Sequence, residues 1–276
     1  MAINLAEKYS PKIVQQFTID SVVMGKAKAK YDWDGVRTVK VFNIQTVDMV
    51  DYDATKGSNR FGTVTELQDD VQTMTVTKNR AFTLAIDKEN NTSQMMVKAA
   101  GTVMQAQMKE KMIPEYDKYC LDKWAKDTNV TKVNDGSLTK SNIVEKVAAA
   151  ITSFVNNNVP LDGNYLFIGA TEYAKLILSP EFLNLEKLGN KALEKGVCGE
   201  FQEQQVVRVP DSYLPNINFM LCHGESLVAP TKIKTLRILT DVQGIDGSVL
   251  EGRQMYDAFV LKQRAKGVYV STKTAE

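Results

Sequence analysis

The stretch RAFTLAIDKENNTSQ, residues 80–94, joins a β-type pattern to a helical one. Its first half alternates apolar and polar side chains, as a strand does, and its second half is acidic and rich in asparagine. Closely spaced carboxylates can bind a hard cation, but Asp87 and Glu89 lack EF-hand spacing. Asn91 and Gln94 have the spacing of a capping box, and acids suit the positive end of a helix dipole. We therefore predict a joint between a strand and a helix, made by Asp87, Glu89, Asn91 and Gln94.

The residues before this joint predict a long hairpin. GVRTVKVFNI (35–44) and VQTMTVTKNRAFTLAI (71–86) are β-type runs, and the segment between them is rich in Asp, Gly, Ser and Asn. Neither run has a strong one-sided apolar face, and an isolated two-stranded ribbon is marginal in water. We therefore expect the hairpin to pack against a surface outside its own domain. The candidate contact residues at its tip are Lys56, Asn59, Arg60 and Phe61.

The residues after the joint predict a long helix. Apolar side chains recur at three- and four-residue steps from Met96 to Met108, and the helical pattern resumes beyond Pro114 as far as Ala125. Proline lacks the amide hydrogen that a helix interior needs, so we expect Pro114 to kink or divide the rod. A rod of this length would span roughly 50 Å at 1.5 Å per residue.

The C-terminal half mixes helices and strands, which is typical of an α+β fold. A loop at 128–138 is followed by a helical pattern, then by the buried-strand candidate NYLFIGA (164–170) and by a short helical segment that ends before Pro180. Four further β-type segments follow towards the C-terminus.

Composition excludes several classes of function. The 276 residues carry 34 Lys and Arg against 33 Asp and Glu, so no bulk field draws the chain to a polyanion or an anionic membrane. The three cysteines are far apart and show no metal-ligand spacing, which indicates reduced thiols and no zinc site. We expect neither a classical export signal nor a membrane span. No nucleotide-binding or hydrolase motif occurs, so we expect no cofactor and no metal.

One pair of residues permits an enzymatic interpretation. Cys222 and His223 are adjacent in FMLCHGES, residues 219–226, and a thiol beside an imidazole is the chemistry of a thiol-dependent hydrolase. Neighbours on a strand point to opposite faces, which argues against the convergence that such catalysis needs. A cytoplasmic hydrolase of this kind stays open as an alternative, and it requires a thiol with a depressed pKa.

The order of these elements resembles the major capsid proteins of tailed bacteriophages, whose Hong Kong phage fold is shared with encapsulins and herpesvirus floor domains. The stretch FTLAIDKENN resembles the return of their extended hairpin, the E-loop, and residues from about 92 to 127 resemble their spine helix. The resemblance covers nearly the whole chain and implies an α+β fold. Its implied parts are an N-terminal arm (1–33), the E-loop (34–87), a peripheral domain with the spine helix (88–138), an axial domain (139–228), returning peripheral strands (229–255) and a closing β segment (256–276).

The resemblance implies a structural protein and not an enzyme. Such a protein assembles with itself into the hexamers and pentamers of an icosahedral head around double-stranded DNA, without sequence-specific DNA binding. It is located in the virion and assembles in the cytoplasm of the bacterial host. A portal and a separate scaffolding protein are the other implied partners, and no membrane is involved. An encapsulin-type nanocompartment shell remains an alternative with the same fold.

Overall fold

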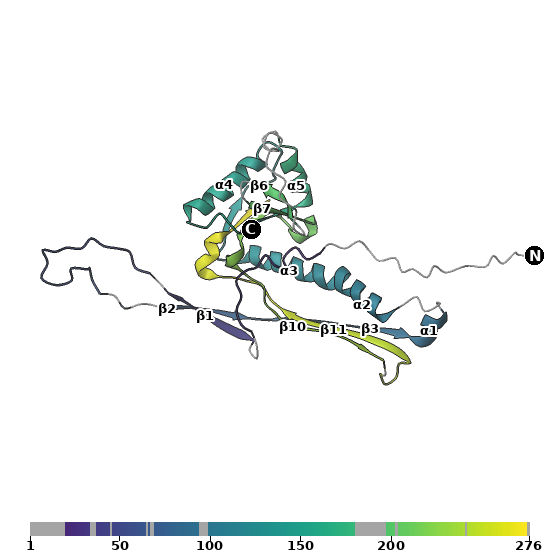
Figure 1. Ribbon diagram of the computed structural model, residues 1–276. Coiled ribbons are helices and arrows are strands. Elements are labelled where there is room, and N and C mark those ends of the chain that lie inside the picture. The colour runs from purple at the N-terminus through teal and green to yellow at the C-terminus, as the bar shows by residue number, and fades with distance from the viewer. Residues whose placement is uncertain are drawn as a thin grey trace, which may run out of the picture.

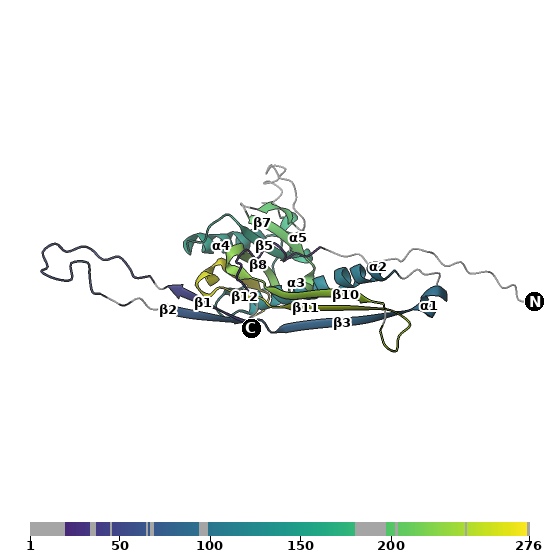
Figure 2. The same ribbon diagram turned by 60° about the horizontal axis from the view of Figure 1, so that its bottom comes forward.

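The computed structural model describes residues 20–33, 37–44, 46–64, 66, 69–93, 99–179, 197–201, 204–240 and 242–274. A long, narrow base carries a helical rod, and a thicker body stands above the rod (Figure 1). A two-stranded hairpin projects from one end of the base, as a second view also shows (Figure 2). The molecule is therefore extended, with one thick part and one thin projection.

The body is built on a six-stranded sheet in the order β4-β13-β8-β5-β7-β6. Both central strands, β5 and β8, consist almost wholly of buried residues, so each of their faces must be covered. Phe167 and Met220 pack with Trp124 of α3 (Ile113–Lys126) on one face, while Ile168 and Phe219 pack with the helices α4 and α5 on the other. The strands are β4 (Thr131–Asn134), β5 (Asn164–Gly169), β6 (Val197–Phe201), β7 (Gln204–Val209), β8 (Ile217–His223) and β13 (Val268–Thr272), and the helices are α4 (Ile143–Asn156) and α5 (Ala170–Ile177).

The base is a three-stranded antiparallel sheet in the order β10-β11-β3. Its strands are β10 (Thr231–Leu239), β11 (Gly247–Tyr256) and β3 (Lys78–Asp87). Gly247 pairs with Asp87, and a Cβ at Gly247 would lie 2.1 Å from the carbonyl oxygen of Ile86. Any side chain at position 247 would therefore force β3 and β11 apart at the end where the helix α1 (Lys88–Ser93) begins.

The projecting hairpin is shorter than the sequence predicts. Strand β1 (Thr38–Ile44) pairs with β2 (Asp69–Thr75), whereas β3 belongs to the base sheet. The predicted E-loop of 34–87 therefore includes a strand of the base sheet, because the run 71–86 contains two strands with different partners. The alternation of side chains continues through Val76 and Thr77, so it does not mark the change of partner.

The rod is one helix with an irregular middle. It runs through α2 (Ala100–Gln107), a π-helical turn, η1 (Met108–Met112), and α3 (Ile113–Lys126), which is about 40 Å at 1.5 Å per residue. The prediction of a helix starting at about 92 and capped by Asn91 is wrong, because Asn91 lies inside α1 and the N-cap of α2 is Ala99. Pro114 is the second residue of α3, after the π-helical turn that ends at Met112, so the helix changes type close to the predicted position, while a kink there stays a prediction. Gln94 lies outside the described residues.

Short elements complete the chain. They are β9 (Leu227–Val228), β12 (Phe259–Val260) and the 3-10 helices η2 (Asp211–Tyr213), η3 (Gly224–Ser226) and η4 (Lys262–Gly267). No helix in the described ranges is long and apolar enough to cross a membrane.

Candidate functional site

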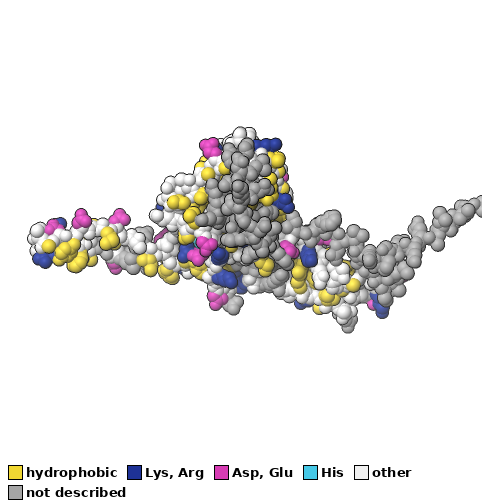
Figure 3. Space-filling model, turned by 45° about the horizontal axis from the view of Figure 1, so that its top comes forward, with side chains coloured by type: hydrophobic (Ala, Val, Ile, Leu, Met, Phe, Trp, Pro, Cys, Tyr) yellow, Lys and Arg dark blue, Asp and Glu magenta, His cyan; other side chains and the backbone are white. Residues whose placement is uncertain are grey.

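Exposed apolar side chains concentrate on the projecting hairpin. Nine of the sixteen large apolar side chains that are exposed in the described part of the chain lie between residues 42 and 71. Figure 3 shows apolar side chains along this projection. An exposed apolar surface of this kind marks a contact with another molecule. We call the nine residues the hairpin strip: Phe42, Ile44, Val47, Met49, Val50, Tyr52, Phe61, Val64 and Val71.

The tip of the hairpin is held in shape by contacts within the loop. The rings of Tyr52 and Phe61 meet edge to face, with their centroids 4.9 Å apart. Asp53 accepts hydrogen bonds from the backbone and hydroxyl of Thr55 at 3.0 and 2.6 Å, and these bonds hold the pKa of Asp53 below its usual value. Arg60 Nε donates to the carbonyl of Lys56 at 2.6 Å. The tip therefore presents its apolar side chains on an ordered loop, which lowers the entropic cost of binding.

The four predicted tip residues divide into two groups. Lys56, Asn59 and Arg60 serve the loop itself: Lys56 pairs with Asp53 at 3.5 Å, and Asn59 has a positive φ of 56° and accepts from the amide of Gly62. Phe61 is 85% exposed and is available to a neighbour. The prediction missed the larger apolar set, whose sequence signal is the placement of bulky apolar residues in a turn-rich segment.

Three side chains fasten the base of the hairpin to the C-terminal segment. Gln72 bridges β2 to the start of η4, donating to the carbonyl of Val260 and accepting from the amide of Lys262, both at 2.8 Å. Lys262 Nζ also contacts Asp70 at 2.7 Å, and Gln263 donates to the carbonyl of Ile44 at 3.1 Å. Residues more than 180 positions away in the chain therefore set the direction of the hairpin.

Asp257 joins the hairpin, the base sheet and the rod. Its side chain is 2% exposed and accepts hydrogen bonds from the amide and hydroxyl of Thr77, both at 2.8 Å. Tyr119 on α3 donates to the other carboxylate oxygen at 2.8 Å, as does the amide of Ala258 at 2.9 Å. Burial raises the pKa of Tyr119, so this phenol stays a donor at neutral pH. Four donors thus satisfy one buried carboxylate at the point where the hairpin leaves the base.

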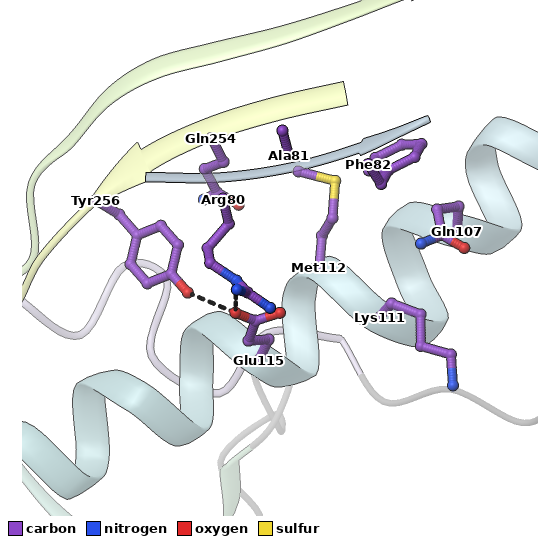
Figure 4. A pocket seen from close by; sticks show the side chains of 9 residues that line it. All are labelled: Arg80, Ala81, Phe82, Gln107, Lys111, Met112, Glu115, Gln254 and Tyr256. Atoms are coloured by element: carbon purple, nitrogen blue, oxygen red, sulfur yellow. Dashed lines mark hydrogen bonds and ion pairs between the residues drawn. The ribbon is translucent and has the colours of Figure 1, made fainter. Parts of the chain in front are cut away.

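A shallow pocket of about 160 Å³ lies between the rod and the base sheet (Figure 4). Glu115 on α3 points across it to Arg80 on β3, with 2.6 Å between the carboxylate oxygen and Nε, and Tyr256 donates to the same oxygen at 3.4 Å. Both Arg80 and Glu115 are about half exposed, and such a pair is worth roughly 0–1 kcal/mol. The contact orients the rod on the sheet and offers no nucleophile with an adjacent base.

The predicted joint lies between the base sheet and the rod. Asp87 ends β3, and Glu89 lies in the first turn of α1. Within the described residues no group of His, Cys, Asp or Glu side chains has an arrangement that could hold a metal ion. For these acids, a role in joining the strand to the helix therefore stays a better interpretation than a metal site.

The arm is anchored to the rod by a buried carboxylate. Asp117 of α3 is 2% exposed and accepts from the Ser21 hydroxyl at 2.6 Å and from the Val22 amide at 2.8 Å. Burial outweighs these hydrogen bonds and raises the pKa of Asp117. The arm therefore begins its path along the subunit at a fixed point.

The geometry does not assemble a catalytic pair from Cys222 and His223. The Cys222 side chain is fully buried against the rod, and burial raises the pKa of its thiol well above the usual value. A catalytic thiol needs the opposite shift. His223 is partly exposed, and its Nδ1 accepts from the amide of Glu225 at 3.2 Å. The thiol-dependent hydrolase is therefore contradicted by the state of its nucleophile.

His223 gives the fold a weak sensitivity to acid. Burial lowers its pKa, so the unfolded chain takes up a proton near pH 6.5 before the folded chain does. Stability is therefore fully present above pH 6.5 and falls as the pH drops towards the folded pKa. We expect the thermal midpoint to fall less in His223→Asn than in the wild type between pH 7 and pH 5.5. The chain has one histidine, so this pH dependence is assigned to His223. Thermal midpoints that fall equally in the wild type and in His223→Asn would contradict the assignment.

Comparisons with known proteins identify the fold. No family model and no curated protein matches the chain. Among solved structures, one from Mycobacterium phage Che8 matches over 100% of both chains with a TM-score of 0.78 at 17% identity. The capsid structure of the cyanophage P-SCSP1u matches 99% of this chain and 94% of its own with a TM-score of 0.75 at 12% identity. A virus-like particle from Pyrococcus furiosus matches 85% of this chain and 86% of its own, with a TM-score of 0.55 at 11% identity.

These matches define an extended α+β fold that is found in the shells of viruses and virus-like particles. More particularly, the chain has the Hong Kong phage capsid fold of tailed-phage capsid structures, as its sequence predicts. The division of the chain into the E-loop, spine helix, peripheral domain and axial domain of that fold stays a prediction.

Proposed function

We propose that this chain is the major capsid protein of a tailed phage or prophage, a structural subunit that assembles with itself into an icosahedral shell. The hairpin strip is the observation that carries the proposal. Nine bulky apolar side chains on a thin projection contribute little to the core of the subunit at their degree of exposure, and most of their remaining area can be buried only against another molecule.

The shape of the subunit favours a neighbouring copy as that molecule. The hairpin points away from the body, so its tip meets a different surface on the next subunit, and such head-to-tail contacts close into rings when the rotation permits (Figures 1 and 2). Rings of six and five subunits, which tile an icosahedral shell, follow from the proposal. The arm would cross to an adjacent subunit, and the axial domains would gather around the ring axes.

The remaining partners follow from the same proposal. The near-neutral charge of the chain suits a shell whose packaged double-stranded DNA must slide and leave, without sequence-specific contacts. A portal and a separate scaffolding protein would complete the head, which would assemble in the host cytoplasm and persist in the virion. A nanocompartment shell is the second candidate, and the TM-scores of 0.78 and 0.75 for two phage structures favour the first candidate.

Electron microscopy tests the proposal directly. We expect the purified protein, expressed with the assembly genes that neighbour it, to form closed shells or rings of five and six subunits. A protein that sediments as a monomer at every concentration under these conditions would exclude a shell function. Portal and terminase genes beside the coding sequence would favour a phage head, whereas a neighbouring gene for a cargo enzyme would favour a nanocompartment.

A further inference from the structure

A second pocket lies at the base of the hairpin and has the character of a binding groove. It measures about 430 Å³ and runs along Val41, Phe42 and Asn43 of β1, between the arm residues 28–31 and the segment 261–264. Its walls carry the basic residues Lys28, Lys30 and Arg264, the carboxylate Glu225, and the apolar side chains of Val41, Phe42 and Leu261. Among the described strands, β1 pairs with β2 alone, so its other edge is open towards an additional segment.

One buried group in this groove lacks a partner. Asn43 is 7% exposed, and its side-chain Nδ2 makes no hydrogen bond with any described residue. A buried amide donor without an acceptor costs about 1–3 kcal/mol. Because this donor is itself buried, it is not open to a ligand, and recognition in the groove must come from the exposed side chains around it.

The charges around the groove favour an acidic occupant. Arg264 pairs with Glu225 at 2.7 Å, and the ammonium group of Lys28 lies 5.8 Å from the ring centroid of Tyr165, whereas Lys30 is exposed at the rim. The groove carries three positive side chains, Lys28, Lys30 and Arg264, against the single carboxylate of Glu225. An anion with apolar neighbours would match both the charge and the apolar walls.

The hairpin of the same chain carries a segment with this chemistry. Asp48 and Asp51 are exposed and flank Met49 and Val50, which are 99% and 60% exposed. Figure 3 shows acidic side chains beside apolar ones along the projection. The hairpin extends away from its own base in both ribbon views, so this segment meets the groove of a different subunit (Figures 1 and 2).

We propose that the groove receives residues 48–51 of a second copy of this chain, with the exposed Lys30 pairing with Asp51. Met49 and Val50 then cover the apolar walls at Phe42 and Leu261. The proposal rests on the shell function above and names the surface that accepts the hairpin. The contact is head-to-tail, because the segment and the groove are different surfaces, and each subunit offers one of each.

A charge swap tests the pairing with two exposed residues that do not endanger the fold. We expect Lys30→Glu and Asp51→Lys each to reduce the yield of shells at least tenfold, measured by sedimentation and electron microscopy, with thermal midpoints unchanged. The double variant Lys30→Glu/Asp51→Lys restores the opposite charges and is expected to recover assembly. Lys140→Glu, an exposed lysine in the body, is the matched control and should assemble like the wild type.

Each outcome decides between defined alternatives. Normal assembly of both single variants would overturn the pairing, and so would a defect in both that the double variant does not correct. A defect in Lys30→Glu alone would show that another acidic segment occupies the groove, which also overturns the proposal. In these cases the wild type still forms shells, whereas failure of the wild type to assemble would refute the proposed function itself.

Discussion

A subunit in which Met49, Phe61 and Val64 are replaced by serine is expected to fold normally and to form no shells. These three side chains are the most exposed of the hairpin strip, at 99%, 85% and 90%, so they contribute little to the stability of the isolated subunit. Substitutions at such positions usually change the free energy of unfolding by no more than about 0.5 kcal/mol each. The thermal midpoint should therefore shift by only a few degrees.

The same substitutions have a large expected effect on assembly. Burial of one such side chain against a neighbour contributes roughly 1.5–3 kcal/mol, so the loss of three removes at least about 4 kcal/mol from each contact. That loss weakens each contact about a thousandfold, and it recurs at every hairpin in the shell. Sedimentation and electron microscopy should therefore show free subunits at concentrations where the wild type is fully assembled.

A matched control separates a surface effect from damage to the loop. Ser58→Ala with Thr63→Ala changes two exposed polar residues of the same tip and should leave assembly intact. Normal shells from the triple serine variant would show that the hairpin strip is not an assembly surface. Loss of soluble folded protein would instead place these side chains in the core of the subunit.

The order of the elements could be predicted from the sequence because it depends on local patterns. The buried strand Asn164–Gly169, the helical pattern that ends near Lys126 and the turn-rich tip all have periodicities that act over a few residues. The long polar loop and the absence of a known catalytic motif predict a contact surface at the tip. Phe61 is 85% exposed there, and its contact with a neighbour stays a prediction.

What the sequence did not reveal depends on partners that are distant in the chain. Strands β2 and β3 have similar composition, and only their pairing with β1 and β11 separates them. Strand β13 lies between β4 and β8 because it pairs with residues 131–134 on one side and with residues 217–222 on the other, which no local pattern specifies. Asn91 shows the limit of a capping motif, because it lies inside α1 and the N-cap of α2 is Ala99.

Asp257 is the clearest functional residue that sequence reasoning missed, and its replacement is expected to have the largest effect on stability. It follows β11 as a single acidic residue without a motif, and its donors Thr77 and Tyr119 are 180 and 138 positions away. We expect Asp257→Ala to lower the free energy of unfolding by about 3–5 kcal/mol, because it leaves several buried donors unsatisfied.

Two further variants allow the loss of the buried carboxylate to be compared with smaller changes near it. Tyr119→Phe removes one donor and leaves the carboxylate with three, so a loss of about 1 kcal/mol is expected. Asp70→Asn removes the charge of an exposed partner of Lys262 at the hairpin base and should cost no more than roughly 1 kcal/mol. Denaturant unfolding of the four proteins would rank them, and a loss in Asp257→Ala no greater than that in Asp70→Asn would contradict the role of the buried carboxylate.

Loss of Asp257 is expected to affect assembly as well as stability, because Asp257 helps to hold the direction of the hairpin. Because the Thr77 amide bonds to Asp257 where β2 passes into β3, loss of the carboxylate frees the hairpin to pivot about its base. A tip that no longer points at the next subunit must be reordered on docking, which adds an entropic cost to every contact. We therefore expect Asp257→Asn, which keeps the size of the side chain, to fold at low temperature but to yield irregular or incomplete shells. Regular shells from a folded Asp257→Asn protein would show that the hairpin is aimed by its other anchors, Gln72 and Lys262.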